Sequence, residues 1–435
     1  MTIGEYIRLK VFKIINLLKK DSIQVYLNEL EIFEMEEAKY AVVEKKLYEF
    51  LRRAQDSTPL YNEKKNEYNL NAYPVITKKF ISNHLELILS KNYSKQELKK
   101  VTTSGSYGTP FSFYLTSEKK KRQSAEAIFY SKKANYEVGI CHGYFRTKLS
   151  KSKIKRWLQN EYFICSKVIG EAFYTETRKL LKKKKIKVLI GFASAIGMFA
   201  EFCIDKGDKP EDFTIYGVLT FAETLTAKQQ DNISMAFGCK VVSRYGTEEL
   251  GILGYQEDRE KGFVLNTCNY IFEVLKLNED ISVSPGEIGR VVVTDLHSDA
   301  LPLIRYETGD LAILGDVFSE NKCWAKSLKS LSGRVIQIIN APNGDQLFSS
   351  YFENILEKYK IVSQFQLIQE TEKEFTLRIV PKLTFQTEDF SESELEIEMK
   401  TWLGNDAQIN IEIVEDIEML PSGKRTSIIN KLILM

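Results

Sequence analysis

The sequence predicts an α/β protein: a large multi-layer N-terminal domain with a parallel sheet plus a β subdomain, and a small α+β C-terminal domain. Three observations lead to this fold class. Short apolar segments alternate with amphipathic helical segments from about residue 95, a strand-rich stretch follows them, and the pattern changes again beyond residue 334. A chain of 435 residues with 43% hydrophobic residues exceeds one ordinary core, so two or more domains are expected.

Residues 1–60 are expected to be helical, because Glu34–Arg53 is rich in Glu, Ala, Lys and Leu and is followed by the Ser57-Thr58-Pro59 breaker. The first twenty residues place Ile, Leu, Val and Phe at helical spacing with lysines between them. That pattern fits a membrane-surface helix or a first helix docked on the body, and we favour the docked helix. Charges interrupt this segment and no apolar run is long enough to cross a bilayer, so neither a signal peptide nor a transmembrane segment is expected.

The central part of the chain predicts parallel strands covered by helices. Strands expected at Lys187–Ile190, Phe213–Thr220 and Lys240–Ser243 alternate with helices expected at Ala195–Lys206 and Ala227–Phe237. Such alternation is typical of layered α/β proteins with parallel pairing.

Two later stretches predict the β subdomain and the C-terminal domain. Gly286–Thr294 and Ile304–Tyr306 are strand-rich. Past Ser332-Gly333-Arg334, we expect a compact α+β unit, with the boundary near Gly333–Gln337. The chain is thereby divided into domains 1–335 and 336–435. The expected strands of the second are 335–339, 365–369, 375–380 and 409–414, and its expected helices are 352–358 and 393–403.

Charge and cysteine usage limit the partners. Sixty-one basic and fifty-nine acidic residues leave a net charge of +2, which does not favour a nucleic-acid partner. The lysine runs 119–122 and 182–185 lack interleaved aromatic residues and are interpreted as solvated helix faces. Six cysteines lie singly, without a CxxC pair, as in a reduced, cytoplasmic protein.

The segment Thr103–Pro110 has the composition of a phosphate-binding loop. Gly105 and Gly108 allow the backbone to turn tightly and approach a ligand. The hydroxyl donors of the loop are Thr103, Ser104 and Ser106. No Gly-Lys-Ser/Thr follows, so this is not a Walker A loop, and such a segment taken alone is more often an ordinary turn. The rest of the chain must decide between these interpretations.

Five segments in order resemble the motifs of adenylate-forming enzymes. Thr103–Pro110 resembles their phosphate loop, with Tyr107 where threonine is usual, and Tyr245–Glu249 resembles their YG-x-x-E motif. Gly286–Asp310 resembles the GExG…T…PLIRYxTGD stretch of the phenylacetate–CoA ligase branch. The last two are Ser332–Arg334, which resembles the ribose and hinge segment, and Leu420–Arg425, which resembles the C-terminal P-x-GK-x-R loop. Leu70–Ile81 further resembles the CapK-like members associated with capsular polysaccharide synthesis.

The resemblance implies an ATP- and Mg²⁺-dependent activation of a carboxylic acid. The acid attacks the α-phosphate of ATP, giving an acyl-adenylate and pyrophosphate, before a thiol or amine displaces AMP. It implies that Glu249 holds Mg²⁺ and that Lys424, on a mobile small domain, meets the α-phosphate and carboxylate oxygens. Tyr245 would stack on adenine, and Asp310, with Arg334 nearby, would bind the ribose. The implied nucleotide-binding residues are Thr103, Ser104, Gly105, Ser106, Tyr107, Gly108, Ala222, Glu223, Tyr245, Gly246, Thr247, Asp310 and Arg334.

Departures from the family pattern bear on metal binding and on the second half-reaction. The stretch Gly251–Glu273 has only Cys268 and no histidine, so the zinc cluster of some relatives is not expected. Gln337 stands where a hinge aspartate is common. The histidines His84, His142 and His297 match no triad or metal spacing. His142 fits either an acyl pocket or core packing, and core packing is favoured.

The function expected from the resemblance is an adenylate-forming ligase acting on a small carboxylic acid, with a sugar acid as one candidate. Its acceptor is an amine, for amide ligation in surface-polysaccharide synthesis, or CoA. An aryl-acid CoA ligase of the phenylacetate type is the alternative. A non-catalytic adenylate-binding protein is the second alternative. Tyr107 and Gln337, which depart from the family motifs, are compatible with it, whereas Lys424 argues against it. A homodimer is the default oligomeric expectation.

Overall fold

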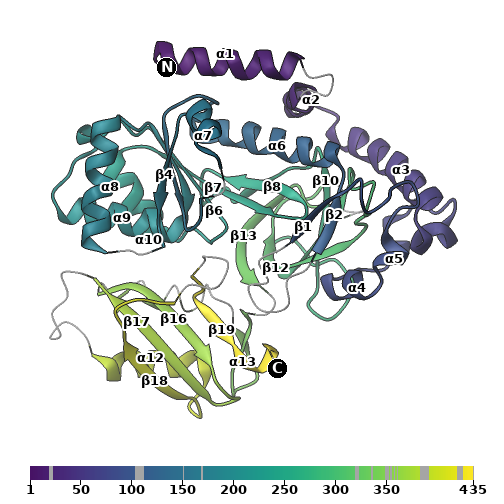
Figure 1. The fold of residues 1–435 in the computed structure, drawn as a ribbon. Helices are drawn as coiled ribbons and strands as arrows, with labels where there is room; N and C mark the ends of the chain where they lie inside the picture. The colour runs from purple at the N-terminus through teal and green to yellow at the C-terminus, as the bar shows by residue number, and fades with distance from the viewer. Residues whose placement is uncertain are drawn as a thin grey trace.

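The computed structural model describes residues 1–18, 23–102, 112–149, 151–167, 170–318, 323–334, 337–347, 352, 355–356, 358–359, 361–382, 391–418 and 425–434. A large N-terminal body carries helices along its outer side, and a smaller C-terminal domain lies against its opposite side (Figure 1). The α/β fold class, with a separate small C-terminal domain, is confirmed.

Three helices form the N-terminal region, as expected for residues 1–60: α1 (Ile3–Leu18), α2 (Ile23–Met35) and α3 (Lys39–Ser57). The helix α3 buries Val43, Leu47 and Phe50, spaced at three and four residues, in a cluster that includes Trp324. It ends immediately before Thr58 and Pro59, as the breaker predicts. Short helices then lead into the body, and these are η1 (Pro59–Lys64), η2 (Leu70–Ala72), α4 (Lys78–Asn83) and α5 (Leu85–Ile88).

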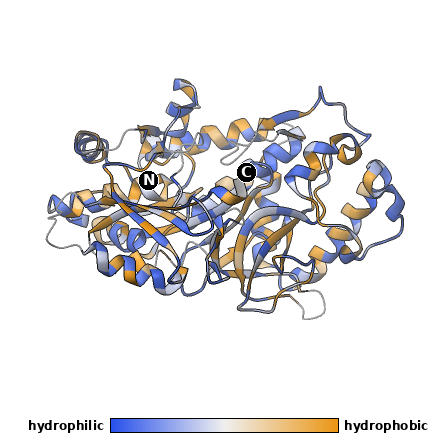
Figure 2. Cartoon of the chain, turned by 90° about the horizontal axis from the view of Figure 1, so that it is seen from below, coloured by the Kyte–Doolittle hydropathy of each residue, from blue (hydrophilic) through white to orange (hydrophobic). Residues whose placement is uncertain are grey.

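Eleven of the described strands form one sheet, in the order β10-β11-β12-β13-β9-β8-β7-β6-β5-β3-β4. Its parallel part contains β3 (His142–Arg146), β4 (Glu161–Cys165), β5 (Val188–Phe192), β6 (Gly217–Phe221) and β7 (Lys240–Thr247). The predicted parallel pairing and both predicted helices are confirmed here. The accompanying helices are α6 (Ser117–Ser131), η3 (Lys132–Ala134), α7 (Lys153–Gln159), α8 (Glu171–Lys184), α9 (Ala193–Asp205), η4 (Pro210–Asp212) and α10 (Ala227–Phe237). Helices around the sheet alternate hydrophobic and hydrophilic residues, as packing on one side requires (Figure 2).

The rest of this sheet is antiparallel and corresponds to the predicted β subdomain. Its strands are β8 (Gly251–Gln256), β9 (Phe263–Leu265), β10 (Tyr270–Leu275), β11 (Ile288–Asp295), β12 (Tyr306–Leu314) and β13 (Ser327–Arg334). It has its own hydrophobic cluster but is continuous with the parallel part, because β7 pairs with β8. A separate hairpin, β1 (Lys99–Thr102) and β2 (Ser112–Leu115), flanks the predicted phosphate loop.

The C-terminal domain packs around a core of its own. Its four-stranded sheet has the order β18-β17-β16-β19. The elements are β14 (Ile339–Asn340), β15 (Gln346–Leu347), β16 (Val362–Gln369), β17 (Glu374–Pro381), α12 (Glu392–Leu403), β18 (Gln408–Ile413), β19 (Ile428–Asn430) and α13 (Lys431–Leu434). The proposed domain boundary at 335/336 lies outside the described residues, as do three residues of the predicted helix 352–358.

The helix α6, which follows the predicted phosphate loop, is anchored by buried charges. The ammonium of Lys119 lies 2.7 Å from the carboxylate of Asp295 on β11, and both side chains are at most 1% exposed. Arg122 bonds to Glu29 and Asn269, and the Glu126 carboxylate accepts from Asn269 and Tyr270. The interpretation of 119–122 as a solvated helix face is therefore wrong for Lys119 and Arg122, because tertiary ion pairs bury them.

We predict that Lys119→Met destabilises the N-terminal domain by roughly 3 to 5 kcal/mol, because it leaves the Asp295 carboxylate buried without its counter-charge. Chemical unfolding followed by near-UV circular dichroism measures the change. Lys261→Met is the matched control, since that side chain is 83% exposed. The double variant Lys119→Met/Asp295→Asn is expected to regain part of the loss. Equal unfolding midpoints for Lys119→Met and the control would contradict this role of the ion pair.

Candidate active site

Two tyrosine–carboxylate hydrogen bonds join β12 to the β7 segment. The Tyr245 hydroxyl on β7 donates to Asp310 Oδ2 at 2.8 Å, and the Tyr306 hydroxyl on β12 donates to Glu249 Oε1 at 2.7 Å. Tyr306 and Asp310 lie four residues apart on β12, whose pairing with β11 is irregular between Glu307 and Leu311, so the two hydrogen bonds themselves, and not strand alternation, show that both side chains face the β7 segment. Three strands separate β7 from β12 in the sheet, so these contacts require the antiparallel part to curl back toward β7. The curl brings the predicted motifs at 245–249 and 305–310 together.

Glu249 is a buried carboxylate, not a solvated residue at a helix start. It is 2% exposed, and its Oε1 atom also lies 3.1 Å from the ammonium of Lys78 on α4. Burial raises the pKa of Glu249, but the charge of Lys78 and the hydrogen bond from Tyr306 outweigh burial, so the pKa is lowered. The side chain is therefore an anion at neutral pH. The Tyr306 and Lys78 contacts are both made by Oε1, and Oε2 takes part in neither of them. Mg²⁺ prefers anionic oxygen ligands, so Oε2 is the atom of Glu249 that suits this cation.

Asp310 lies at the end of a strand pair that leads toward the C-terminal domain. Its β-ladder partner is Arg334, whose Nε atom is 3.5 Å from Asp310 Oδ1. Each carboxylate oxygen has two acceptor positions, so Asp310 keeps acceptor capacity beyond Tyr245 and Arg334. Burial and the Asp310 charge raise the pKa of Tyr245 well above its ordinary value, so its hydroxyl remains a donor.

The predicted adenine loop at Ala222-Glu223 follows β6 directly. Ala222 is exposed and has a φ of +68°, a left-handed conformation that is uncommon for a residue with a Cβ and is concentrated at functional sites. The Glu223 carboxylate accepts from the backbone N–H of Ser194 at 2.9 Å and from that of Arg425 at 3.3 Å. Arg425 belongs to the C-terminal domain, so this domain reaches the loop beside β6.

Other polar contacts connect the two domains. The Gln337 side chain accepts from the backbone N–H of Arg334 and donates to the Thr426 hydroxyl. The Lys382 ammonium lies 3.0 Å from the Glu201 carboxylate of α9. Gln337, which stands where a hinge aspartate is common in the family that the motifs resemble, therefore makes neutral hydrogen bonds to Arg334 and Thr426.

Several predicted site residues lie outside the described part of the chain: Thr103, Ser104, Gly105, Ser106, Tyr107, Gly108 and Lys424. The two ends of the phosphate loop are nonetheless held together, because Thr102 and Ser112 are paired between β1 and β2. The helix after the loop contacts the Glu249 segment, since the Gln123 amide donates to the Glu249 carbonyl at 3.2 Å. Gly246 and Thr247 end β7, and the Thr247 hydroxyl accepts from the N–H of Leu250.

Two arginines that the sequence analysis did not single out lie at the carboxyl edge of the parallel strands. Arg146 ends β3 and Arg244 lies on β7, in register with Phe221 at the end of β6. Their guanidinium carbons are 4.7 Å and 5.4 Å from the centre of the Phe221 ring. Burial, and to a smaller extent Arg146, lower the pKa of Arg244 to about 10, which leaves it charged at neutral pH. Neither arginine forms an ion pair with a carboxylate in the part of the chain that the structure describes.

The carboxyl ends of parallel strands are the usual ligand-binding edge of an α/β sheet, and that rule is the signal that points to these arginines. Lys78 was also missed as a site residue, although it lies in the Leu70–Ile81 segment, because only the tertiary fold brings α4 to Glu249.

His142 packs in the core, as favoured from the sequence. It is 2% exposed, its Nδ1 atom contacts the Ile140 carbonyl at 2.9 Å, and its Nε2 atom lies 3.5 Å from Glu161.

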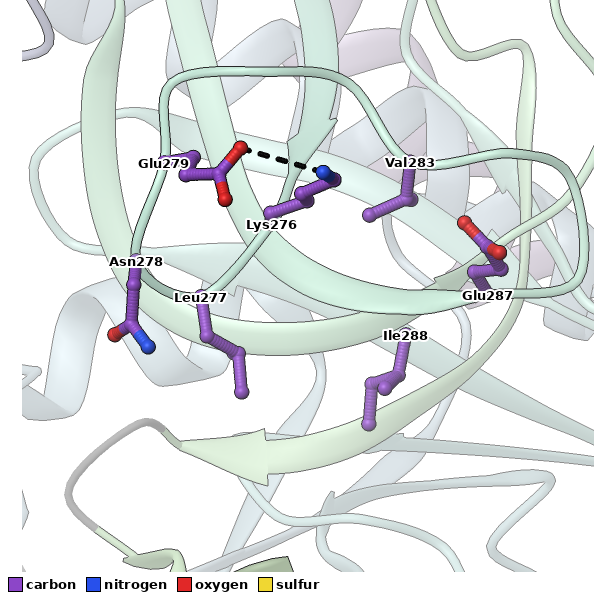
Figure 3. Close-up of a pocket in the computed structure, with 7 residues that line it drawn as sticks. All are labelled: Lys276, Leu277, Asn278, Glu279, Val283, Glu287 and Ile288. Atoms are coloured by element: carbon purple, nitrogen blue, oxygen red, sulfur yellow. Dashed lines mark hydrogen bonds and ion pairs between the residues drawn. The ribbon is translucent and has the colours of Figure 1, made fainter.

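A surface pocket of about 550 Å³ lies away from these residues, in the loop between β10 and β11 (Figure 3). All its lining side chains come from 276–288, and an ion pair joins Lys276 to Glu279 at the start of the loop. Leu277 and Ile288 pack near Leu311 and Ile338. None of the predicted site residues that the structure describes lines this pocket, which is therefore separate from Tyr245, Glu249 and Asp310.

Comparison with known proteins supports the resemblance drawn from the motifs. Residues 339–431 match the family model of the CapK C-terminal domain. Protein CapK of Staphylococcus aureus is 24% identical over 409 residues, which cover 89% of this chain and 86% of CapK. Phenylacetate-coenzyme A ligase of Thermus thermophilus is 27% identical over 112 residues, a quarter of each chain.

Solved structures share the fold. 2-Hydroxyisobutyryl-CoA ligase in the postadenylation state matches with a TM-score of 0.67 at 15% identity, covering 89% of this chain and 88% of the ligase. The same ligase in the thioesterification state gives a TM-score of 0.55 at 16% identity, with 91% and 90% covered. The amide bond synthetase McbA of Marinactinospora thermotolerans gives 0.54 at 12% identity, with 76% and 68% covered. The fold is that of adenylate-forming ligases.

We predict that Lys78→Met lowers the stability of the domain at neutral pH by roughly 1 to 2 kcal/mol, a value reduced by the partial exposure of Lys78. Because the folded pKa of Glu249 is lowered, its stabilising effect is present above its ordinary value of 4.5 and is lost as pH falls through the folded pKa. In the variant, burial raises this pKa instead. The difference in thermal midpoint between wild type and variant should therefore shrink as pH falls from neutrality toward about 4.

Thermal unfolding followed by circular dichroism across this pH range tests the prediction. Lys79→Met is the matched control, since Lys79 is the exposed neighbour on the same helix. If the difference in thermal midpoint between wild type and Lys78→Met stays constant from neutral pH to about pH 4, Lys78 acts through packing and not through the charge of Glu249.

Proposed function

We propose that this CapK homologue, with the fold of adenylate-forming ligases, activates a carboxylic acid as an acyl-AMP and transfers the acyl group to an amine or to CoA. The observation that carries the proposal is the hydrogen bond from the Arg425 N–H to the Glu223 carboxylate. It brings the residue after Lys424 to the proposed adenine loop, on the edge of the domain that holds Tyr245, Glu249 and Asp310. Residues 1–335 and 336–435 are proposed as the two domains.

The chemistry requires charge compensation while the acid oxygen displaces pyrophosphate from the α-phosphate of ATP. Asp310 is proposed to accept hydrogen bonds from the ribose hydroxyls, with Arg334 beside it. Lys424 is proposed to contact the α-phosphate and the acid oxygens. Mg²⁺, when bound at Glu249, supplies positive charge against the phosphates. The Lys78 ammonium, now at Glu249, would have to release this carboxylate when the cation arrives.

The loop from Thr103 to Gly108 is proposed to bind the phosphates through its backbone N–H groups and hydroxyls. Its closed base at Thr102 and Ser112, and the contact from Gln123 to Glu249, support a position beside Glu249. Ala222, Glu223, Gly246 and Thr247 are proposed to line the nucleotide.

The acid is proposed to bind at Arg146 and Arg244. Guanidinium groups bind carboxylates through charge-assisted hydrogen bonds, and these two are half-buried next to the strand end that leads into the adenine loop. An acid with a further anionic or polar substituent, such as a sugar acid, suits two guanidinium groups better than a purely apolar acid does. The Leu70–Ile81 segment, which supplies Lys78, supports a role in capsular polysaccharide synthesis and hence an amine acceptor in the cytoplasm.

We predict that Lys424→Ala lowers pyrophosphate–ATP exchange by about 100-fold or more while ATP still binds, because the cation stabilises charge that develops during the reaction. Exchange with a panel of aryl, fatty and uronic acids identifies a usable acid first. Lys373→Ala, an exposed lysine of the same domain, is the control. Full exchange activity in Lys424→Ala would remove this residue from the mechanism, and absence of exchange with every acid in folded protein would favour the adenylate-binding alternative.

We predict that Arg146→Gln and Arg244→Gln each raise the KM for the acid about 10-fold, since each removes a charge-assisted hydrogen bond. The KM for ATP should change little. Exchange kinetics at varied acid and varied ATP separate the two constants, and Arg259→Gln, an exposed arginine, is the control. Variants in which only the KM for ATP rises would place these arginines at the nucleotide and not at the acid.

A further inference from the structure

The first helix, α1, presents its apolar side to solvent. Ile3, Ile7, Ile14 and Leu17 are 81%, 54%, 56% and 83% exposed. Their spacing places them along one helix face, with Lys10 in the middle of the same stripe. The residues that α1 buries are polar, namely Glu5 and Asn16. This orientation is the reverse of the one that a helix docked on a hydrophobic core adopts.

The polar side of α1 is fixed to the body by specific contacts. Glu5 Oε2 lies 2.7 Å from the Lys187 ammonium, and Glu5 Oε1 accepts from the Cys141 N–H at 3.0 Å. Burial raises the pKa of Glu5, but these contacts and that with Thr2 lower it overall to about 2. The Arg8 Nε–H donates to the Trp157 carbonyl at 3.0 Å. The apolar stripe is therefore held outward by bonds on the other side of the helix.

The exposed apolar surface continues onto α7. Trp157 is 65% exposed and Ile154 is 74% exposed, and the Arg8 guanidinium lies 5.1 Å from the centre of the Trp157 ring. The helix α1 lies along the outer side of the body, on the opposite side from the C-terminal domain (Figure 1). We call these residues of α1 and α7 the α1–α7 surface.

Basic residues surround this surface. Residues 1–18 contain three basic residues, Arg8, Lys10 and Lys13, and a single acid, Glu5, which is buried and paired. Residues 147–160 contain five more basic residues and no acid. The whole chain has a net charge of only +2, so the rest of it is net negative and positive charge is concentrated here. Of these basic residues, Lys151 pairs with Glu161, while Lys10, Lys13, Lys153 and Lys155 are exposed.

We propose that the α1–α7 surface binds the surface of an anionic phospholipid bilayer, with α1 lying in the plane of the headgroups. An apolar stripe flanked by lysines and an exposed tryptophan are the features of interfacial helices. Lys10, within the stripe, can extend its ammonium to the headgroups while its methylenes stay apolar. A second copy of the chain is a poorer occupant, because two copies of the same basic patch would repel each other. None of the described helices has both the length and the apolar content needed to cross a bilayer.

Vesicle sedimentation of the full-length protein tests the proposal. We expect at least about 10-fold stronger binding to vesicles of equal phosphatidylcholine and phosphatidylglycerol than to phosphatidylcholine alone, with salt weakening the binding. The triple variant Ile7→Ser/Ile14→Ser/Leu17→Ser should lose about 10-fold or more, because it removes apolar area without changing the charge. The matched control is Met235→Ser/Ile281→Ser/Ile397→Ser, whose three residues are 59%, 56% and 67% exposed elsewhere.

Lys10→Gln/Lys13→Gln should weaken binding to the anionic vesicles only, and the emission of Trp157 should shift to the blue on binding. The substituted side chains are exposed, and thermal unfolding verifies that the variants remain folded. Equal binding to both vesicle types, or equal binding by the two triple variants, would overturn the proposal. So would a dimer, detected by sedimentation velocity, that the α1 triple variant abolishes without any binding of wild type to vesicles.

Discussion

The structure depends on the two tyrosine–carboxylate hydrogen bonds that hold β12 against the β7 segment. Tyr245 bonds to Asp310 and Tyr306 bonds to Glu249, so each segment supplies one donor and one acceptor. All four side chains are largely buried, where a hydrogen bond is strong and an unpaired carboxylate is costly. The bonds close a sheet whose hydrogen-bonded neighbours would otherwise keep β7 and β12 three strands apart. Motifs sixty residues apart in sequence lie side by side because the sheet curls.

Much of the fold followed from local patterns in the sequence. The helix α10 has the predicted bounds, and the parallel pairing of β5, β6 and β7 follows from strands alternating with helices. The hydrophobic periodicity of the sequence did not predict that Lys119 is buried, because a lysine on a helix is ordinarily solvated. Lys119 is buried because it forms an ion pair with Asp295, on a strand far away in the sequence. The pairing of Lys78 with Glu249 could not be predicted from the sequence either, because no local pattern encodes a contact between distant parts of the chain. The motif residues that the structure describes do lie together, whereas their chemical roles stay predictions.

The contacts between the domains are mainly polar. Three polar pairs cross the boundary: Glu201 with Lys382, Glu223 with the Arg425 backbone, and the Arg334 backbone with Gln337. Interfaces of this kind separate more readily than hydrophobic ones. Two structures of 2-hydroxyisobutyryl-CoA ligase match this chain at TM-scores of 0.67 and 0.55 with similar coverage, which shows that they share its fold. The Gln337 amide donates to the Thr426 hydroxyl, whose own proton goes to the Ile428 carbonyl, so a carboxylate at position 337, which has no proton to donate, could not replace this contact.

The ladder pairing of Asp310 with Arg334 has a mechanical consequence. Arg334 is the last residue of β13, where the chain leaves the large domain, and its neighbour across the ladder carries the carboxylate assigned to the sugar of the nucleotide. Because Arg334 and Asp310 are ladder partners, a rotation of the small domain that pulls on the end of β13 would displace the strand segment that carries Asp310. If Asp310 binds the ribose as proposed, rotation of the small domain would change that contact, and nucleotide binding would in turn change how freely the small domain rotates.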